Sequence, residues 1–461
     1  MPSRFRQGTA RILHVHQCAA LFCAMLALVH CSRHSVPPPV AQDPDSGVVA
    51  VPCDPAPKYS VSAGPPASVS PVQATGWSIT SSGGSCAGLQ PRAIGPMLQW
   101  SSPSTDYYVC DAPEIDGDGT VAIHTPVLEV AHEEGPAAVA LLSTDGSSRS
   151  IINSNTVRSV QPRSSSGFWL LDNHCWGKET RNRVALDGGL QESTPSEDSR
   201  MFPNPQGGFV EARTAADFLS TEVRWLDDHL VATSPWHSVK TWPPGNRTEK
   251  LALDKLGRVL FLTFHFPSTF GAPPPPSDWT FSAQWIGPEG LLGPEFLPPV
   301  PMYLSGRTPV WPAGWGELVA LADGGLAAYH SPAASISARE QPGTGLQAGT
   351  SLDVQPSGWY AVFRPPDSKL SNAVPAWMPR YESLRLSADG RFYMAVQRDG
   401  ANCQRTASIV SSVGDVCATV PLVDSASCSA KATFSGTGTL LLTEYGLSCG
   451  LRWWPALFSV P

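Results

Sequence analysis

The sequence predicts an all-β fold, and three observations support this prediction. Charged residues make up 15% of the 461 residues and hydrophobic residues 42%, so the chain can bury a large core. With 46 Pro and 40 Gly, the chain is poorly suited to long helices. From residue 59 onward, short runs of Val, Leu, Phe, Tyr, Trp and Thr are separated by Gly, Asp, Asn, Ser and Pro, as in strands joined by turns. The one segment with a plausible helical pattern is Ala215 to Trp225.

The N-terminal residues 1–30 have the features of a signal peptide. Arg4, Arg6 and Arg11 supply a positive n-region, and the uncharged run Cys18 to Val29 supplies an apolar h-region. This run is too short to span a membrane comfortably. We therefore expect an exported protein whose first segment is removed.

The sequence Leu28-Val29-His30-Cys31 resembles the lipobox of bacterial lipoproteins. The resemblance implies that Cys31 carries a lipid anchor and that the protein resides in the bacterial cell envelope, anchored in the outer membrane. Residues 31–58 are rich in Pro, Ser and Asp and are expected to form a tether. His30 stands where the lipobox has a small residue, so an unlipidated secreted product is the alternative.

Eight cysteines remain after the signal peptide and Cys31 are set aside, and an even number in an exported chain predicts disulfides. Cys428 and Cys449 lie almost symmetrically about the turn at 436–438, so we expect them to bridge a hairpin. We further suggest the pairs Cys86–Cys110 and Cys403–Cys417. No C-x-x-C spacing is present, which argues against a zinc-ribbon or redox site.

A unit recurs from residue 59 to residue 461, and each copy is a turn with Gly followed at once by an apolar strand. The glycines are Gly119, Gly167, Gly208, Gly257, Gly325, Gly390 and Gly438, and the gaps between them are 48, 41, 49, 68, 65 and 48 residues. The two long gaps contain insertions at 272–277 and 331–349. Without these insertions the period is that of a β-propeller blade.

A second turn often follows the first within the same unit, which gives two hairpins per period, as a four-stranded blade requires. Examples lie at residues 143–147, 187–189, 287–290 and 413–415. The chain is therefore similar to bacterial propeller lipoproteins, and its seven copies predict seven blades, with six or eight as alternatives. The terminal segment Arg452 to Pro461 is expected to be a last strand that closes the ring or caps a blade. The competing fold is a set of tandem β-sandwiches.

Three carboxylates alternate in the turn that contains Glu114, Asp116 and Asp118, ahead of Gly119. Calcium requires six to eight oxygen ligands, and this turn resembles the loop of calcium-binding propeller repeats. The resemblance implies calcium as a candidate ligand, and a plain acidic hairpin is the alternative. The sequence indicates no other cofactor.

The sequence contains no catalytic signature that identifies an enzyme. It lacks G-x-S-x-G, P-loop and G-x-G-x-x-G motifs, and its histidines do not cluster. A net charge of −8 without a basic run argues against nucleic-acid binding. We expect a cell-envelope binding or scaffold module for a protein, peptide or glycan. The alternative is a secreted propeller hydrolase or lyase that acts on polysaccharide or peptide.

Overall fold

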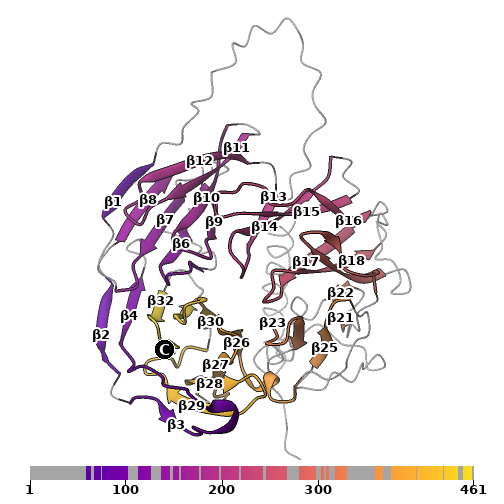
Figure 1. The fold of residues 1–461 in the computed structure, drawn as a ribbon. Helices are drawn as coiled ribbons and strands as arrows, with labels where there is room; N and C mark the ends of the chain where they lie inside the picture. Colours follow the sequence, from indigo (N-terminus) through magenta and orange to yellow (C-terminus); the bar gives the residue numbers. More distant parts are fainter. Residues whose placement is uncertain are drawn as a thin grey trace, which may run out of the picture. The chain divides into compact units, whose positions relative to one another are not determined.

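The chain forms an all-β, seven-bladed β-propeller in which seven small antiparallel sheets are arranged in a ring (Figure 1). The computed structural model describes residues 59–63, 67–73, 75–101, 113–125, 137–145, 149–154, 157–175, 178–196, 199–216, 220–241, 246–266, 280–296, 303–305, 308–310, 317–329, 359–366, 375–400, 402–428, 430–444 and 450–458. The predicted fold class is confirmed, and the alternative of tandem β-sandwiches is wrong.

The first four blades each contain four consecutive strands. Blade 1 consists of β5 (Glu114–Ile115), β6 (Val121–Thr125), β7 (Ala137–Leu142) and β8 (Arg149–Ser154), and blade 2 of β9 (Val157–Pro162), β10 (Phe168–Cys175), β11 (Lys178–Val184) and β12 (Leu190–Ser196). Blade 3 consists of β13 (Ser199–Pro203), β14 (Phe209–Thr214), β15 (Ser220–Leu226) and β16 (His237–Thr241), and blade 4 of β17 (Asn246–Leu253), β18 (Val259–Phe266), β19 (Thr280–Gly287) and β20 (Gly290–Leu291).

The last three blades differ from this plan in strand number or origin. In the described residues, blade 5 consists of β23 (Glu317–Ala320), β24 (Leu326–Tyr329) and β25 (Trp359–Phe363), and a separate hairpin of β21 (Tyr303–Ser305) and β22 (Thr308–Val310) precedes it. Blade 6 consists of β26 (Ser383–Leu386), β27 (Phe392–Arg398), β28 (Arg405–Ser411) and β29 (Val416–Pro421). Blade 7 takes β30 (Ala430–Phe434), β31 (Leu440–Glu444) and β32 (Gly450–Trp454) from the C-terminal end of the chain.

The first strand of each blade lies towards the axis of the ring. In blades 2, 6 and 7, for example, β9, β26 and β30 are innermost and the later strands follow outward (Figure 1). First strands of consecutive blades touch one another: β5 contacts β9, β9 contacts β13, β23 contacts β26, and β26 contacts β30. Such contacts are expected where the blades converge.

A similar turn joins the first and second strands of all seven blades, with one residue more in blade 6. It begins at Asp116, Arg163, Asn204, Asp254, Leu321, Ser387 and Ser435, and in each copy the N–H of that residue donates to a carbonyl at the start of the second strand, over 2.8 to 3.1 Å. The repeated glycines of the sequence lie in or directly after these turns. Gly325 has a φ of +90°, and a Cβ there would lie 2.3 Å from the carbonyl oxygen of Phe363, so only glycine fits.

An N-terminal belt, residues 60–101, wraps the outer edges of three blades. Its strand β1 (Ser60–Ala63) pairs with β8 of blade 1, and β3 (Ser78–Ile79) pairs with β29 of blade 6. In blade 7, β4 (Pro96–Ser101) pairs with β32, and β2 (Ser68–Val72) pairs in turn with β4. The terminal run Arg452 to Pro461 thus helps to close the ring, but β4 from the other end of the chain supplies the fourth strand of that blade.

Each pair of neighbouring blades shares a buried apolar cluster, because neither face of a blade can be covered by that blade alone. The cluster between blades 7 and 1 contains Leu98, Trp453 and Val121, and it completes the ring. The cluster between blades 2 and 3 is the smallest among the described residues and contains only four buried side chains: Trp169, Met201, Phe209 and Leu226. Polar contacts accompany it at that interface.

The predicted helix at Ala215 to Trp225 is wrong. Residues Ser220–Leu226 form the strand β15, in which Val223 and Trp225 alternate with Glu222 and Arg224 so that the apolar pair faces blade 4. In so short a segment, the period-two alternation of a strand resembles one face of a helix. No helix in the described part of the chain is long and apolar enough to cross a membrane.

The disulfide pairings proposed from sequence are also wrong. Cys86 of the short 3-10 turn Gly84–Cys86 is bonded to Cys417 of β29, and Cys403 is bonded to Cys428. The pairs Cys86–Cys110, Cys403–Cys417 and Cys428–Cys449 are therefore excluded, and Cys110 and Cys449 lie outside the described residues. The propeller places β29 beside the belt, which no spacing along the chain reveals. Two disulfides are typical of an oxidising, exported environment.

The bond between Cys86 and Cys417 joins the belt to blade 6 across 331 residues, whereas Cys403–Cys428 closes only 25. A longer closed loop removes more entropy from the unfolded chain. We expect Cys86→Ser/Cys417→Ser to lower the free energy of unfolding by about 2 kcal/mol more than Cys403→Ser/Cys428→Ser does. Urea unfolding of the two double variants measures this difference, and an equal or larger loss in the second variant would contradict it.

Candidate functional site

The two faces of the propeller are built differently. One face, here called the turn face, carries the turns between first and second strands and between third and fourth strands, including the second turns predicted at 187–189, 287–290 and 413–415. The opposite loop face receives the connections between second and third strands and between blades. Two of these connections, residues 267–279 and 330–358, join β18 to β19 and β24 to β25, and a third, residues 364–382, joins β25 to β26.

The acidic turn predicted from sequence lies on the turn face, where it fastens blade 1 to blade 2. Asp116 is buried, and its carboxylate accepts N–H groups from Asp118 at 3.0 Å, Thr120 at 2.8 Å and Gly167 of blade 2 at 2.7 Å. Burial raises the pKa of Asp116 to about 6, against the effect of these donors. Asp254 makes the same link from blade 4 to Gly325 of blade 5.

Few oxygen atoms of this turn are available as calcium ligands. The Asp116 oxygens are occupied by N–H donors, Asp118 is exposed, and Glu114 is half-buried on β5. Within the described ranges, no three His, Cys, Asp or Glu side chains are grouped as a metal site requires. The geometry supports a structural role for Asp116, and calcium binding by Glu114, Asp116 and Asp118 stays a prediction.

A charged cluster that the sequence did not predict lies on the side of blade 3 that faces blade 2. Glu211 of β14 is fully buried, and its carboxylate accepts from Arg181 of β11 at 2.7 Å and from Arg224 of β15 at 2.7 Å. The Ser199 hydroxyl adds a third bond at 2.5 Å. Two guanidinium groups and a hydroxyl therefore replace apolar packing where the smallest apolar cluster lies.

Electrostatics of this cluster favour the ionised carboxylate. Burial alone would raise the pKa of Glu211, but the hydrogen bonds from Ser199 and Arg181 and the positive charge of Arg181 outweigh it, so the pKa lies below its ordinary value of 4.5. A half-buried pair, Arg213 and Glu222 at 2.9 Å, continues the cluster towards the loop face.

Trp236 is held by the arginines of the same cluster. The guanidinium carbons of Arg213 and Arg224 lie 4.0 Å and 4.2 Å from the centre of its ring. Such cation–π contacts occupy the ring that a sugar or aromatic ligand would need. The aromatic richness of the sequence therefore reports packing at this position and in the buried Trp169, Trp285 and Trp453.

A signal for this cluster exists in the sequence. Charges alternate at two-residue spacing in two neighbouring strand-like runs, with Glu211 and Arg213 in one and Glu222 and Arg224 in the other. In antiparallel register these four become direct cross-strand pairs, Glu211 with Arg224 and Arg213 with Glu222. The helical interpretation of Ala215 to Trp225 concealed this pattern.

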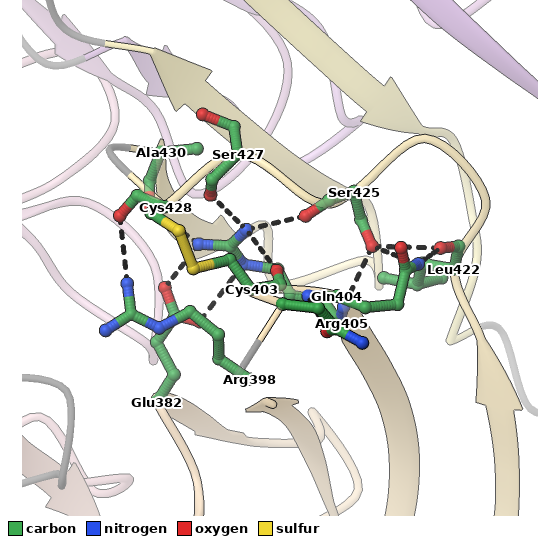
Figure 2. A network of polar contacts seen from close by, with 11 residues as sticks. Glu382, Arg398, Cys403, Gln404, Arg405, Leu422, Ser425, Ser427, Cys428 and Ala430 are labelled. Atoms are coloured by element: carbon green, nitrogen blue, oxygen red, sulfur yellow. Dashed lines mark hydrogen bonds and ion pairs between the residues drawn. A yellow bond between two sulfur atoms is a disulfide. The ribbon is translucent and has the colours of Figure 1, made fainter. Parts of the chain in front are cut away.

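A second polar network orders the loop face at blades 6 and 7 (Figure 2). Arg405 is fully buried and binds both oxygens of Glu382, at 3.0 and 3.1 Å. It also donates to the carbonyl oxygens of Ser425 and Ser427 at 2.7 Å each, and the disulfide Cys403–Cys428 lies beside it. The connection from β29 to β30 is thereby fixed to blade 6 by two hydrogen bonds from one side chain and by one covalent bond.

Charged residues of both signs lie on the first strands around the axis, and Glu249 of β17 and Glu317 of β23 are among the acidic ones. Arg158, Arg200 and Lys431 are each the second residue of β9, β13 and β30, and Arg385 is the third residue of β26. All four side chains reach solvent.

Two comparisons with known proteins give no family. No protein-family model matches the chain, and no curated protein matches it. Similar solved structures do exist, and they are remote in sequence.

A gluconolactonase from Xanthomonas campestris is 13% identical, with 88% of this chain and 100% of that chain covered and a TM-score of 0.33. An acylaminoacyl peptidase from Pyrococcus horikoshii is 9% identical, with 76% and 51% covered and a TM-score of 0.41. Prolyl oligopeptidase B from Galerina marginata is 10% identical, with 76% and 49% covered and a TM-score of 0.38. At these values the similarities carry no argument about the activity of this chain.

We expect Glu211→Gln to lower the free energy of unfolding by about 3 to 5 kcal/mol, because Arg181 is left buried without its counter-charge. The matched control is Glu222→Gln, whose pair is 22 to 26% exposed and is worth less than about 1 kcal/mol. Urea unfolding at neutral pH compares the two variants, and equal effects would contradict the buried role of Glu211.

The ionisation of Glu211 also makes the stability of the protein depend on pH. Because the pKa of Glu211 is lower in the folded state than its ordinary 4.5, its contribution is present above that value and is lost as the pH falls below 4.5 towards the folded pKa. The Glu211→Gln variant is expected to lose less stability than the parent protein between about pH 6 and about pH 3.5. If the stability of the two proteins falls in parallel over this pH range, the lowered pKa of Glu211 is contradicted.

Proposed function

We propose that this protein is an exported binding or scaffold module whose loop face meets a protein, peptide or glycan of the cell envelope. The difference between the two faces is the observation that supports this function. Seven similar first turns lie on the turn face, whereas the loop face receives connections of unequal length and composition. Rigid scaffolds that carry variable connections on one face are typical of binding proteins.

The structure of the ring suits such a role. A surface that binds without induced rearrangement loses less entropy on association. The Arg405 network and the Cys403–Cys428 bond fix the loop face at blades 6 and 7. At blades 2 and 3, Glu211 and its two arginines join neighbouring sheets.

The chain enters the propeller from the loop-face side. In β1, Ser60 pairs with Asn153 and Ala63 pairs with Ser150, so β1 begins at the end of β8 that leads to blade 2. Tyr59, just before β1, donates a hydrogen bond to Asp172 of blade 2 at 2.7 Å. In our proposal the tether of residues 31–58 leaves the domain here and ends at the lipid on Cys31.

Four carboxylates at the blade interfaces give little support to the alternative that the protein is an enzyme. Glu211, Glu382 and Asp254 are engaged by arginines, and Asp116 and Asp254 also accept backbone N–H groups. A general acid or base must be free to exchange its proton with a substrate. These four residues are better suited to holding blades together.

Photo-cross-linking in the native cell tests the loop face. A photoreactive amino acid replaces Asn402 or Val423 on the loop face, and Leu256 or Val413 on the turn face as matched exposed controls. We expect defined adducts from the loop-face positions and none above background from the turn-face positions. Adducts confined to the turn face would contradict the proposal.

Membrane partition tests the anchor. We expect the protein to fractionate with membranes and its mature mass to begin at Cys31 with added acyl chains. Cys31→Ala is expected to abolish both properties. A soluble, unlipidated parent protein would show that His30 prevents lipidation and that the domain is secreted free.

A further inference from the structure

We propose that a groove on the outer rim of blade 6 binds an extended peptide segment of a partner protein, in which an aliphatic residue is followed closely by an aspartate or glutamate. The groove is formed by the belt and has a volume of about 340 Å³. Trp77, Ile79 and residues 89–93 line it. It lies on the outermost strand of the blade 6 sheet and not among the loop-face connections, so this inference does not depend on the partner of the loop face.

The walls of the groove are mainly apolar. Ile79 is 50% exposed, and Trp77 and Leu89 are half-buried against the cluster shared by blades 6 and 7. Nε1 of Trp77 is buried and has no hydrogen-bond partner among the described residues, so the part of its ring that reaches solvent consists of carbon atoms. The volume is at the lower end of the range for ligand pockets, roughly 300 to 1,000 Å³, which suits one or two side chains.

The strand β3 leaves backbone groups unpaired at this groove. It lies at the outer edge of blade 6, and within the described ranges no strand pairs with its other side (Figure 1). The N–H of Thr80 donates to the carbonyl oxygen of Cys417 at 2.9 Å. Ile79 is the preceding residue and lies opposite Ala418. Because the backbone groups of an antiparallel strand alternate in direction, the N–H and C=O of Ile79 point away from β29, towards the free edge.

A peptide strand added at this edge would place a side chain in the groove. A residue that exchanges both backbone hydrogen bonds with Ile79 lies directly opposite it, and opposite residues have their side chains on the same face of the sheet. Ile79 and Trp77 are two residues apart and both line the groove. The added side chain therefore contacts both of them, which favours an aliphatic residue. Because β3 has only two residues, a short segment is sufficient.

The free charge at the groove is positive. Arg92 lines the groove, is exposed, and makes no hydrogen bond or ion pair with a described residue. None of the described residues that line the groove is acidic. The whole chain has a net charge of −8, so an unpaired guanidinium beside an apolar groove is not a general property of its surface. Carboxylates are the acceptors that guanidinium groups bind best, which favours an acidic residue next to the aliphatic one.

The segment that forms one wall of the groove is fixed to blade 6 before any ligand binds. The disulfide Cys86–Cys417 joins the start of this segment to β29. Arg391 of blade 6 donates to the carbonyl oxygen of Ala87 at 2.8 Å, and Ile94 at the other end is buried in the cluster shared by blades 6 and 7. A site that is already ordered loses less entropy on binding, as a short peptide ligand requires.

Selection of peptides from a phage-displayed library of random heptapeptides against the full-length protein tests the proposal. We expect the enriched peptides to share an aliphatic residue with an Asp or Glu close after it. Fluorescence anisotropy then measures the affinity of an enriched peptide labelled with fluorescein. Arg92→Gln is expected to weaken binding about tenfold, which corresponds to about 1.4 kcal/mol for one charge-assisted contact. Replacing the acidic residue of the peptide by its amide is expected to have the same effect, and the two changes together no more than either alone.

Two variants of Ile79 separate the backbone contact from the side-chain contact. Ile79→Ala removes side-chain atoms only, whereas Ile79→Pro also removes the outward N–H and keeps the hydrogen bonds of its neighbours to β29. We expect Ile79→Pro to weaken binding about fivefold more than Ile79→Ala does, the net effect of one neutral hydrogen bond. Thermal melting of each variant establishes that the propeller is intact.

Arg380→Gln is the matched control for Arg92→Gln. Arg380 is exposed and precedes β26, which lies at the opposite edge of the same sheet from β3. This variant is expected to bind the peptide as the parent protein does. The proposal is overturned if no peptide is enriched, or if Arg92→Gln and Ile79→Pro bind as Arg380→Gln does. A concentration-dependent dimer that Ile79→Pro dissociates in analytical ultracentrifugation would show that a second copy fills the groove, and would also overturn it.

Discussion

Backbone hydrogen bonds between β4 and β32 join the two ends of the folded chain, and the other interfaces of the ring depend on this closure. A blade cannot cover its own apolar faces, so an open ring would expose one face at each end. The register pairs Leu451 with Trp100 and Trp453 with Leu98, and these four side chains form the centre of the cluster between blades 7 and 1. The belt then covers β4 with β2 and fastens blade 6 through Cys86–Cys417.

The interfaces inside the closed ring are not equivalent. Most are held by apolar clusters, whereas the interface between blades 2 and 3 combines four buried apolar residues with the carboxylate of Glu211 and its three partners. Desolvation of a buried charge is unfavourable, and only complete hydrogen bonding compensates it. Glu211 meets this condition through Arg181, Arg224 and Ser199. Arg405 meets it in the same way at the loop face of blades 6 and 7.

Local chemistry was predictable from the sequence, and long-range pairing was not. The seven glycines located the seven first turns because a positive φ or a close backbone approach leaves no other residue type acceptable, as at Gly325. The disulfide partners of Cys86 and Cys403 depend on which blades are neighbours, and Cys86 lies 331 residues from Cys417. The belt is not predictable from the sequence for the same reason, since the partner of β4 lies at the opposite end of the chain.

For the candidate sites too, local features were predictable from the sequence and contacts between distant residues were not. The acidic turn was correctly identified as a turn, but the burial of Asp116 and its bond to Gly167 of the next blade appear only in three dimensions. Arg200 and Lys431 are unremarkable along the chain because they are 231 residues apart. Only the common register of the first strands brings Arg200 and Lys431 to one height.

Hydrogen exchange of the backbone amides in β32 and β4 tests ring closure most directly. If β4 fills the last blade, the amides of Gly450–Trp454 and of residues 97–101 are protected as strongly as those of the central strand β28, Arg405–Ser411. If the ring is open, β32 is a free edge. Its amides then exchange as fast as those of the outer strand β12, Leu190–Ser196, which has no buried residue, and that result would contradict the account.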